Sequence, residues 1–395
     1  MSSSAPLPKE AVVAVIGAGA MGAGIAQVAA GAGHPVRLFD TRSGAADDAC
    51  AALGKTFETL AAKGKLDPAA AMAAALRITP VHALADCVGA KLIVEAIIED
   101  LPAKRHLFTE LEAIVADDAI LATNTSSLSV TALAAGMNVP GRVAGMHFFN
   151  PAPVMPLVEI VRGHATSDVV IDTGCNLVSR WGKTAVVAAD TPGFIVNRIA
   201  RPFYGEALRS LDEGIADCAT IDWAMRTFGD FRMGPFELMD LIGNDVNFAV
   251  TTAVYEGFFF DPRFKPSLTQ RRLVDANLLG RKTGQGYYDY REGAARPAPR
   301  QDENLGRAIL DRILAMLINE AVDAVFWQVA TPSDIDLAMV KGVNYPKGLI
   351  AWGEERGYDV TLGRLEALQA EYGEDRYRPS PLLRRLARSG GTLRT

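Results

Sequence analysis

The stretch Val12-Val13-Ala14-Val15-Ile16-Gly17-Ala18-Gly19-Ala20-Met21-Gly22 joins an apolar, β-branched run to three glycines with the spacing G-x-G-x-x-G. The run predicts a buried strand, and residues 23–31 predict the helix that follows it. In such a turn Gly17 permits the tight bend, Gly19 lets a pyrophosphate approach the backbone, and Gly22 lets the helix pack close to the strand. The free N–H groups and the dipole at the helix N-terminus favour the same anion. The stretch therefore predicts a dinucleotide-binding domain of the Rossmann type.

The acidic residue that ends the next strand indicates which dinucleotide is bound. Residues 35–39 predict a second strand, and Asp40 follows it directly. A carboxylate at this point can accept a hydrogen bond from a ribose 2′-OH and repels a 2′-phosphate, so it favours NAD as the cofactor. Arg42 keeps the alternative open, because a nearby arginine can accept the 2′-phosphate of NADP.

Strand and helix patterns alternate over residues 10–190, which predicts an α/β domain with a parallel sheet covered by helices on both faces. Two helical stretches stand out, the alanine-rich 44–76 and the segment 102–116. From residues 190–193 onward the pattern changes to helices joined by Gly/Pro loops, which predicts an all-α part. The hinge between the two parts is a natural place for a cleft. The predicted strands are residues 12–16, 35–39, 91–97, 119–122, 142–147, 156–161 and 184–188.

The helical part contains an internal repeat. Matching pairs recur at an offset of 113 or 114 residues, which predicts two tandem copies of one helical domain. We place a substrate- and dimerisation-type domain at 191–290 and a second, degenerate copy at 304–395, with 291–303 as the linker. The matching pairs are Glu206-Ala207 with Glu320-Ala321, Ile221-Asp222 with Ile335-Asp336, Gly234 with Gly348, and Arg271-Arg272-Leu273 with Arg384-Arg385-Leu386.

The second copy is expected to be structural. Asn197 of the first copy corresponds to Asp311 of the second, whereas the apolar residues within 309–318 are kept. This is the pattern expected when packing is retained and chemistry is lost. We therefore predict that 304–395 packs on 191–290 as a pseudo-dimer, within one chain or exchanged between two chains.

Composition limits the partners. The chain has 395 residues, of which 49% are hydrophobic and 22% charged, and its net charge of −6 recruits neither nucleic acid nor an anionic membrane. The arginine-rich tail 376–394 is explained as part of the second helical copy. No apolar run is long enough to span a bilayer, and the first ten residues look like a lead-in without a targeting signal. Four cysteines without metal-ligand spacing predict no metal site and fit a reducing compartment, so we expect a cytoplasmic protein.

The stretch His147-Phe148-Phe149-Asn150-Pro151 precedes Glu159 and carries the second strong signal. A histidine with a carboxylate partner is the usual general base near neutral pH. Beside a dinucleotide site, this pair predicts hydride transfer coupled to proton transfer, which is alcohol oxidation. The alternative is a core histidine whose hydrogen bonds are purely structural.

Six motifs together resemble those of the L-3-hydroxyacyl-CoA dehydrogenases over residues of about 10–290. The duplicated helical module resembles the bacterial members with two C-terminal domains, including the dehydrogenase part of multifunctional β-oxidation proteins. No hydratase domain precedes the glycine-rich turn, so a stand-alone dehydrogenase is expected. The motifs are Gly17-Ala-Gly-Ala-Met-Gly22, Asn124-Thr-Ser-Ser-Leu128, His147-Phe-Phe-Asn-Pro151, Asp190-Thr-Pro-Gly-Phe-Ile-Val-Asn-Arg198, Met233-Gly-Pro-Phe-Glu237 and Gly280-Arg-Lys-Thr-Gly-Gln-Gly-Tyr-Tyr288.

The resemblance implies roles for four residues in catalysis. His147 matches the general base and Glu159 its carboxylate partner. A proline-rich turn and a returning strand would bring Glu159 back beside His147. Ser126 and Asn197 match the residues that hold the substrate oxygen, and both side chains are short hydrogen-bond donors.

The resemblance also implies contacts with the cofactor and the substrate. Glu99 and Lys104 match positions near the nicotinamide ribose, and Lys282 matches a cofactor contact from the helical domain. Thr56 and Lys63 fall where the family contacts coenzyme A. For each of the three lysines the alternative is a solvated surface charge.

The expected function is the NAD-dependent oxidation of an L-3-hydroxyacyl-CoA to a 3-oxoacyl-CoA, and the reverse reduction, in fatty acid metabolism. The expected partner is an acyl-CoA substrate, and the chain is expected to form a homodimer or an intra-chain pseudo-dimer. One alternative is a β-hydroxyacid or hexulonate dehydrogenase of the same superfamily, which uses no CoA, with a lens-crystallin-like relative in the same neighbourhood. Another is a non-catalytic NAD-binding scaffold or sensor.

Overall fold

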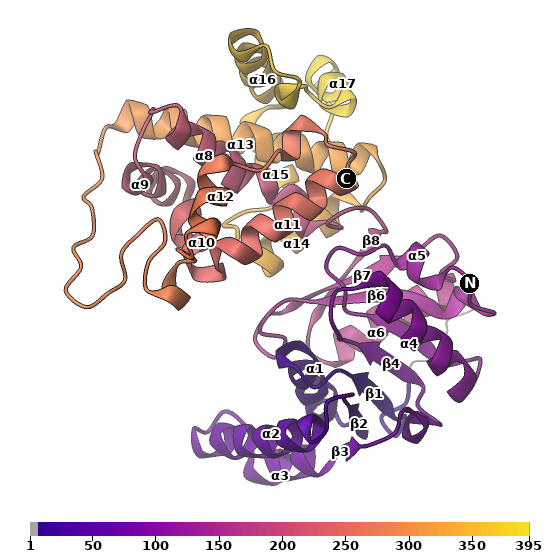
Figure 1. The fold of residues 1–395 in the computed structure, drawn as a ribbon. Helices are drawn as coiled ribbons and strands as arrows, with labels where there is room; N and C mark the ends of the chain where they lie inside the picture. The colour runs from indigo at the N-terminus through magenta and orange to yellow at the C-terminus, as the bar shows by residue number, and fades with distance from the viewer. Residues whose placement is uncertain (1–6, 395) are drawn as a thin grey trace. The chain divides into compact units, whose positions relative to one another are not determined.

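The computed structural model describes residues 7–394, so residues 1–6 of the expected lead-in and Thr395 of the second copy lie outside the described residues. The chain folds as two compact units, of which the first ends at Thr191 and the second begins at Pro192. Figure 1 shows strands and helices in the first unit and helices in the second. The predicted succession of an α/β part and a helical part is confirmed.

The first unit is built on a sheet of eight strands in the order β3-β2-β1-β4-β5-β6-β7-β8. β1 pairs with both β2 and β4, so the strand order reverses at β1, which is where Rossmann-type sheets bind their ligands. The strands are β1 (Val13–Ile16), β2 (Val36–Phe39), β3 (Ile78–Val81), β4 (Leu92–Glu95), β5 (Ile120–Thr123), β6 (Val143–Phe148), β7 (Leu157–Arg162) and β8 (Thr184–Ala189). The helices are α1 (Ala20–Gly31), α2 (Ala45–Ala62), α3 (Pro68–Leu76), α4 (Leu101–Ile114), α5 (Val130–Ala134) and α6 (Asp168–Arg180).

The sheet is mixed, so the prediction of a wholly parallel sheet is wrong. β7 pairs with β6 in antiparallel fashion, and β8 then runs parallel to β7. The reason is the connection between β6 and β7, which is a short proline-rich turn, whereas parallel neighbours need a crossover of a dozen or more residues. The strand β3 was not predicted, because its four residues include Pro80. β3 lies at the edge of the sheet, where a missing N–H group is tolerated.

The helical stretch predicted at 44–76 is two helices. α2 ends at Ala62 and α3 begins at Pro68, and Gly64 between them has a φ of +66°, a conformation that favours glycine. The Asp67 side chain accepts a hydrogen bond from Ala70 N and caps α3. Figure 1 shows the two helices side by side next to β3.

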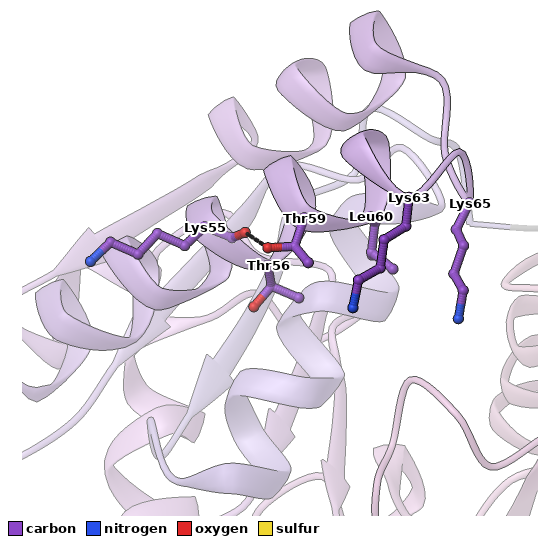
Figure 2. A pocket seen from close by; sticks show the side chains of 6 residues that line it. All are labelled: Lys55, Thr56, Thr59, Leu60, Lys63 and Lys65. Carbon is purple, nitrogen blue, oxygen red and sulfur yellow. Dashed lines mark hydrogen bonds between the residues drawn. The ribbon is translucent and has the colours of Figure 1, made fainter.

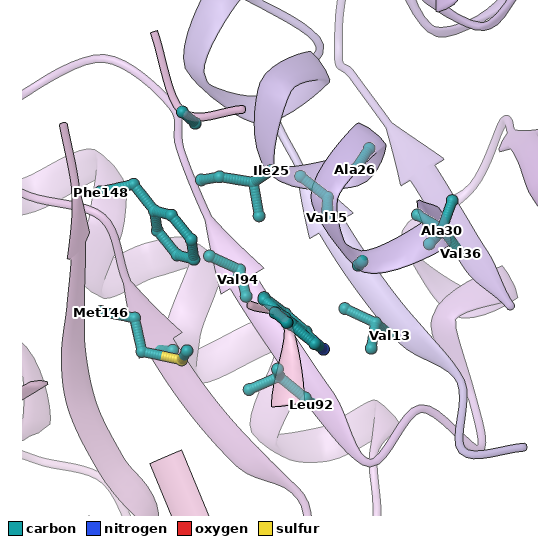
Figure 3. Packing of buried hydrophobic residues seen from close by; sticks show 14 of the residues in the cluster. Val13, Val15, Ile25, Ala26, Ala30, Val36, Leu92, Val94, Met146 and Phe148 are labelled. Atoms are coloured by element: carbon teal, nitrogen blue, oxygen red, sulfur yellow. The ribbon is translucent and has the colours of Figure 1, made fainter. Parts of the chain in front are cut away.

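The core of the first unit lies between the central strands and the helices that cover them. Figure 3 shows Ile25, Ala26 and Ala30 of α1 packed over Val13 and Val15 of β1. The alternate β1 residues point to the opposite face and are equally buried, so both faces of the sheet are covered. This double burial explains why the strands read as continuous apolar runs.

The second unit consists of helices in the part of the chain that the structure describes. No helix among the described residues is long and apolar enough to cross a bilayer. The helices are α7 (Val196–Ile199), α8 (Arg201–Asp212), α9 (Cys218–Gly229), α10 (Pro235–Ile242), α11 (Asn244–Gly257), α12 (Leu268–Asp275), α13 (Glu303–Phe326), α14 (Pro332–Val343), α15 (Leu349–Arg356), α16 (Tyr358–Tyr372) and α17 (Pro381–Ser389).

The internal repeat is visible in the helices. The series α9 to α12 recurs as α14 to α17, at the offset of 113 or 114 residues found in the sequence. Two aspartates repeat the same contact: Asp222 accepts hydrogen bonds from the N–H groups of Phe236 and Glu237, and Asp336 does so from those of the equivalent residues in α15. The two copies therefore share local geometry as well as sequence, while the exact domain boundaries stay a prediction.

The two copies pack on each other within the chain. The long helix α13 of the second copy lies against α8 and α9 of the first, and Ile313, Leu317 and Ile318 on it are completely buried. Arg312 on α13 also donates to Glu206 on α8 over 2.9 Å, in the interior. The predicted packing of 304–395 on 191–290 is thus seen inside one chain.

Removing residues 304–395 should expose the apolar faces of α8 and α9. We expect the truncated protein to aggregate or to self-associate, because an exposed apolar patch of this kind seeks a partner. Size-exclusion chromatography with light scattering would measure this, with the full chain as the control. A truncated protein that stayed monodisperse, with the same oligomeric state and the same activity, would show that the second copy is an independent appendage.

Candidate active site

The glycine-rich turn after β1 has three different constraints. Gly17 has a φ of +105°, and a Cβ there would lie 2.5 Å from the carbonyl oxygen of Ala96 in the loop after β4. A Cβ on Gly22 would lie 1.7 Å from the carbonyl oxygen of Gly17, so the helix approaches the turn itself more closely than it approaches the strand. A Cβ on Gly19 would meet nothing within 4 Å, which leaves open space over the backbone there. The turn therefore fits a ligand that lies against Gly19.

The start of α1 and the end of β2 complete this part of the site. Gly19 is the N-cap of α1 and supplies no side-chain cap, so the first-turn N–H groups face an anion site. The Asp40 carboxylate is held in place by the N–H of Ala18, 2.8 Å away, and by the guanidinium of Arg42. The hydrogen bonds from Arg42 hold the pKa of Asp40 at about 2, so this carboxylate is charged at neutral pH. Arg42, the residue that could have accepted the 2′-phosphate of NADP, is therefore paired with Asp40.

The structure brings His147 and Glu159 together. They face each other across the antiparallel strands β6 and β7, and His147 Nδ1 lies 2.6 Å from Glu159 Oε2. Glu159 is completely buried and His147 is almost so. A buried carboxylate at this distance fixes the imidazole tautomer and stabilises the imidazolium, so the pair is chemically suited to proton transfer.

Lys104 and Glu99 belong to a network of buried charges. Lys104 is only 1% exposed, so a solvated surface charge is excluded for it, and its Nζ lies 2.5 Å from Glu95 Oε1 and 3.3 Å from Glu99 Oε2. Glu95, at the end of β4, also accepts from the Thr123 hydroxyl over 2.7 Å. The ammonium thus joins the carboxyl ends of β4 and β5 to the start of α4.

Glu99 fixes the loop that carries Ser126. Its Oε1 accepts from the Thr125 hydroxyl at 2.6 Å and from the Ser126 N–H at 3.0 Å. Burial alone would raise the pKa of Glu99, but these hydrogen bonds and the charge of Lys104 outweigh it and lower the pKa below its usual value. The loop is also tied to the strand of the histidine, because Asn124 Oδ1 accepts from the Phe148 N–H over 2.9 Å. Ser126 and His147 are therefore held by one connected set of contacts.

Three residues of this network were not predicted as site residues: Glu95, Asn124 and Thr125. Asn124 and Thr125 stand in the motif that contains Ser126, and only their contacts show what they do. Glu95 gave a signal that could have been used, since it is a charged residue inside an apolar strand. A carboxylate is almost never fully buried unless it is paired, so its position predicted a buried cation nearby.

Asn197 and Lys282 lie in the second unit. Asn197 is half-buried on α7, and its carbonyl oxygen accepts from Arg201 Nε over 2.7 Å. Lys282 is exposed, and its ammonium lies 2.6 Å from Asp245 Oδ1. This surface ion pair is compatible with the solvated alternative for Lys282. The roles of both residues in the site stay predictions.

Thr56 and Lys63 lie on the outer surface of α2 and line one hollow. This cavity of about 250 Å³ is also lined by Lys55 and Lys65, so three lysines contribute to its wall. Figure 2 shows Lys55 extending from α2, and Lys63 and Lys65 extending from the turn after it. A hollow with these charges suits a phosphate-bearing ligand.

Two protein-family models match the chain. The model described as 3-hydroxyacyl-CoA dehydrogenase, NAD binding domain, matches residues 12–191. The model described as 3-hydroxyacyl-CoA dehydrogenase, C-terminal domain, matches residues 193–290 and 309–394. The first unit is thus an NAD-binding domain. The C-terminal model matches twice, and its match at 309–394 falls on the second helical copy.

Individual relatives agree with these matches. The 3-hydroxyadipyl-CoA dehydrogenase of Escherichia coli (strain K12) is 39% identical over 460 aligned positions, which cover 95% of this chain and 97% of that protein. The probable 3-hydroxybutyryl-CoA dehydrogenase of Bacillus subtilis (strain 168) is 41% identical over 280 positions, covering 71% of this chain and 97% of that protein. The crystal structure of 3-hydroxybutyryl-CoA dehydrogenase from Escherichia coli K12 has a TM-score of 0.91 at 38% identity, covering 96% of this chain and 98% of that one.

Asp40 should determine which dinucleotide is preferred. We expect the wild-type protein to bind NADH more tightly than NADPH, and Asp40→Ala to narrow the ratio by about tenfold, or about 1.4 kcal/mol, because the charge that repels a 2′-phosphate is gone. Titration of both cofactors by fluorescence would measure the ratio. Arg42→Ala is the control and should not favour NADPH. A wild-type preference for NADPH would mean that Arg42 governs the site.

Proposed function

The chain belongs to the 3-hydroxyacyl-CoA dehydrogenase family of oxidoreductases, and we propose that it interconverts an L-3-hydroxyacyl-CoA and a 3-oxoacyl-CoA. The observation that carries this proposal is the buried pair of His147 and Glu159, 2.6 Å apart, in the same unit as the dinucleotide turn. A general base in an NAD-binding domain is what the oxidation of an alcohol requires.

His147 is proposed as the general base. With Glu159 on Nδ1, that nitrogen carries the ring proton, so Nε2 is the nitrogen proposed to take the proton of the 3-hydroxyl. As the ring becomes an imidazolium, the buried carboxylate stabilises the new charge. In the reverse direction Nε2 returns the proton to the oxygen of the 3-oxo group.

Ser126 and Asn197 are proposed to hold the substrate oxygen. Each can donate a hydrogen bond to an oxygen on which negative charge develops, which favours the transition state over the ground state. The contacts of Glu99 with the Ser126 loop support this role, because they fix the backbone at Ser126 on an otherwise irregular loop.

NAD fits the first unit, and when bound it accepts the hydride from C3 of the substrate. Gly17, Gly19 and Gly22 shape the turn for the pyrophosphate, and Asp40 is placed for the ribose hydroxyls. We propose Glu99 and Lys104 as cofactor contacts on the nicotinamide side, where they also fix the Ser126 loop. Lys282 is proposed as a further contact from the second unit.

The lysine-lined hollow on α2 is proposed to bind the phosphates of coenzyme A. Thr56 and Lys63, which the family resemblance matches to coenzyme A contacts, line it. The relatives' names include 3-hydroxyadipyl-CoA and 3-hydroxybutyryl-CoA dehydrogenases, so both a dicarboxylic and a short aliphatic acyl group are candidate substrates. The reaction is proposed to be cytoplasmic, because four cysteines without metal-ligand spacing fit a reducing compartment.

His147→Gln should leave NADH binding nearly unchanged and lower kcat by at least about 100-fold, the usual scale for losing a general base. Glu159→Gln should lose rate as well, because a neutral amide stabilises the imidazolium less. Steady-state kinetics and cofactor titration would measure both effects. His106→Gln is the matched control, since His106 is exposed on α4. A near wild-type kcat for His147→Gln would contradict the assignment.

Acetoacetyl-CoA with NADH should be turned over, and free acetoacetate should be used at least about 100-fold less efficiently, because binding of the CoA moiety contributes to kcat/KM. A panel that adds 3-oxoadipyl-CoA would identify the acyl group. Oxidation of NADH, followed spectrophotometrically, provides the measurement. Efficient use of free hydroxyacids would instead support a dehydrogenase without CoA, and no turnover of any substrate would support a scaffold.

A further inference from the structure

The segment that carries Asn197 has little stability of its own. α7 consists of the four residues Val196–Ile199, and one turn of helix is not stable in isolation. Gly193 and Phe194 before it have φ angles of 75° and 48°, so the chain turns sharply as it enters the helix. The direction of the Asn197 side chain therefore depends on tertiary contacts of its neighbours.

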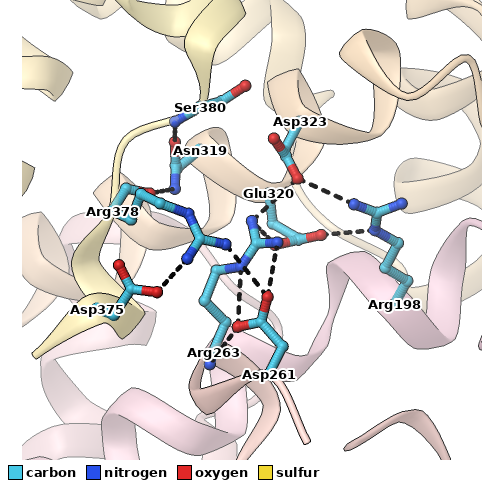
Figure 4. A network of polar contacts seen from close by, with 9 residues as sticks. All are labelled: Arg198, Asp261, Arg263, Asn319, Glu320, Asp323, Asp375, Arg378 and Ser380. Carbon is cyan, nitrogen blue, oxygen red and sulfur yellow. Dashed lines mark hydrogen bonds and ion pairs between the residues drawn. The ribbon is translucent and has the colours of Figure 1, made fainter. Parts of the chain in front are cut away.

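Arg198, the residue after Asn197, is anchored by the second helical copy. Its Nε donates to Glu320 Oε1 over 2.6 Å, and its Nη2 donates to Asp323 Oδ2 over 3.1 Å. Figure 4 shows both carboxylates reaching from α13 toward this guanidinium. All three side chains are almost completely buried, so water neither screens their charges nor replaces their hydrogen bonds.

Arg263 completes the cluster on its other side. Its Nη1 lies 2.9 Å from Asp323 Oδ2 and 3.3 Å from Glu320 Oε2, and its Nη2 lies 3.2 Å from Asp261 Oδ2, so Arg263 shares the two carboxylates that bind Arg198. A buried charge is tolerated when it is paired and costly when it is not. Loss of one carboxylate would therefore shift the arginines that remain, and Arg198 is covalently next to Asn197.

The repeat supplies an equivalent cluster that lacks the site residue. Arg312 and Glu206 occupy the positions of Arg198 and Glu320 in the other copy, and Glu206 Oε2 accepts from Arg312 Nε over 2.9 Å. Arg312 follows Asp311, whose carboxylate is taken by ion pairs with Arg356 and Arg364. Each copy thus holds the arginine of the other, but one of these arginines adjoins Asn197 and the other adjoins a structural aspartate.

We propose that Glu320 and Asp323 are positioning residues for the reaction, which hold Arg198 and through it fix α7 and the direction of the Asn197 amide. This inference rests on the proposed role of Asn197. It gives the second copy a part in catalysis although its own equivalent of Asn197 is an aspartate engaged elsewhere. The second copy serves as the fixed support of the segment that carries the site residue.

The test compares two buried glutamates that differ in what they support. Glu320→Gln should lower kcat by about tenfold with little change in KM for NADH, because small misplacements of a catalytic group carry large costs in rate. Glu206→Gln removes the equivalent carboxylate, which is just as buried, and should lower the melting temperature by a similar amount while kcat changes less than about twofold. Equal effects of the two variants on kcat would overturn the inference, as would an unchanged kcat for Glu320→Gln.

A double-mutant cycle with Asn197→Ala separates positioning from general damage. In the Asn197→Ala background, Glu320→Gln should cause almost no further loss of kcat, whereas losses that multiply would overturn the inference. If Asn197→Ala lowers kcat and Glu320→Gln does not, the proposed function stands and the inference fails. If Asn197→Ala leaves kcat unchanged, the proposed role of Asn197 fails and the inference fails with it.

Asp323→Asn covers the case in which Glu320→Gln does not fold. It leaves Glu320 in place and removes the second carboxylate on Arg198, so it is the milder change. The expected result is a smaller loss of kcat that again vanishes in the Asn197→Ala background. A folded Asp323→Asn protein with wild-type kcat would count against the inference.

Discussion

The antiparallel register of β6 and β7 is the constraint on which the site depends. It places His147 directly opposite Glu159, and a slip by one residue would turn the side chains of one strand to the other face of the sheet. Burial enforces the register, since both strands are covered along nearly their whole length. The bond from the Phe148 N–H to Asn124 then fastens the Ser126 loop to the same strand. One register therefore fixes His147, which we propose as the base, together with Glu159 and the neighbouring loop.

Two groups of buried charges in this protein are paired with charges of opposite sign. Lys104 is buried between Glu95 and Glu99, and Arg198 is buried beside Glu320 and Asp323. Such groups add little net stability compared with apolar packing, but each demands particular partners in particular positions. Contacts with these charges can therefore fix segments that lack regular backbone hydrogen bonds of their own. The loop of Ser126 and the short helix α7 are two such segments.

Local signals made much of the fold predictable, and long-range contacts account for what was missed. The strand and glycine turn at 12–22 could be predicted because they depend on neighbouring residues. The repeat in the helical part could be predicted because its two copies have similar sequences. The strand β3 was missed because its residues become a strand only beside β2. The antiparallel direction of β7 follows from the short turn that joins it to β6, because a parallel strand would have needed a longer crossover connection. β8 then runs parallel to β7. In the site, the pairing of His147 with Glu159 was predicted, whereas the burial of Lys104 between Glu95 and Glu99 was missed, although the charged residue Glu95 inside an apolar strand was a signal for it.

The two helical copies show how a duplicated fold can divide packing from chemistry. At equivalent positions, Asn197 is half-buried on a one-turn helix, whereas Asp311 lies within the long helix α13 and is neutralised by arginines. The continuous helix needs no outside support, while the short one does. Because each copy offers a buried glutamate to the arginine of the other, the same interaction can stabilise one copy and orient a functional segment in its neighbour. Under the proposed role of Glu320, the second copy supports the segment that carries Asn197, although its own equivalent residue is Asp311.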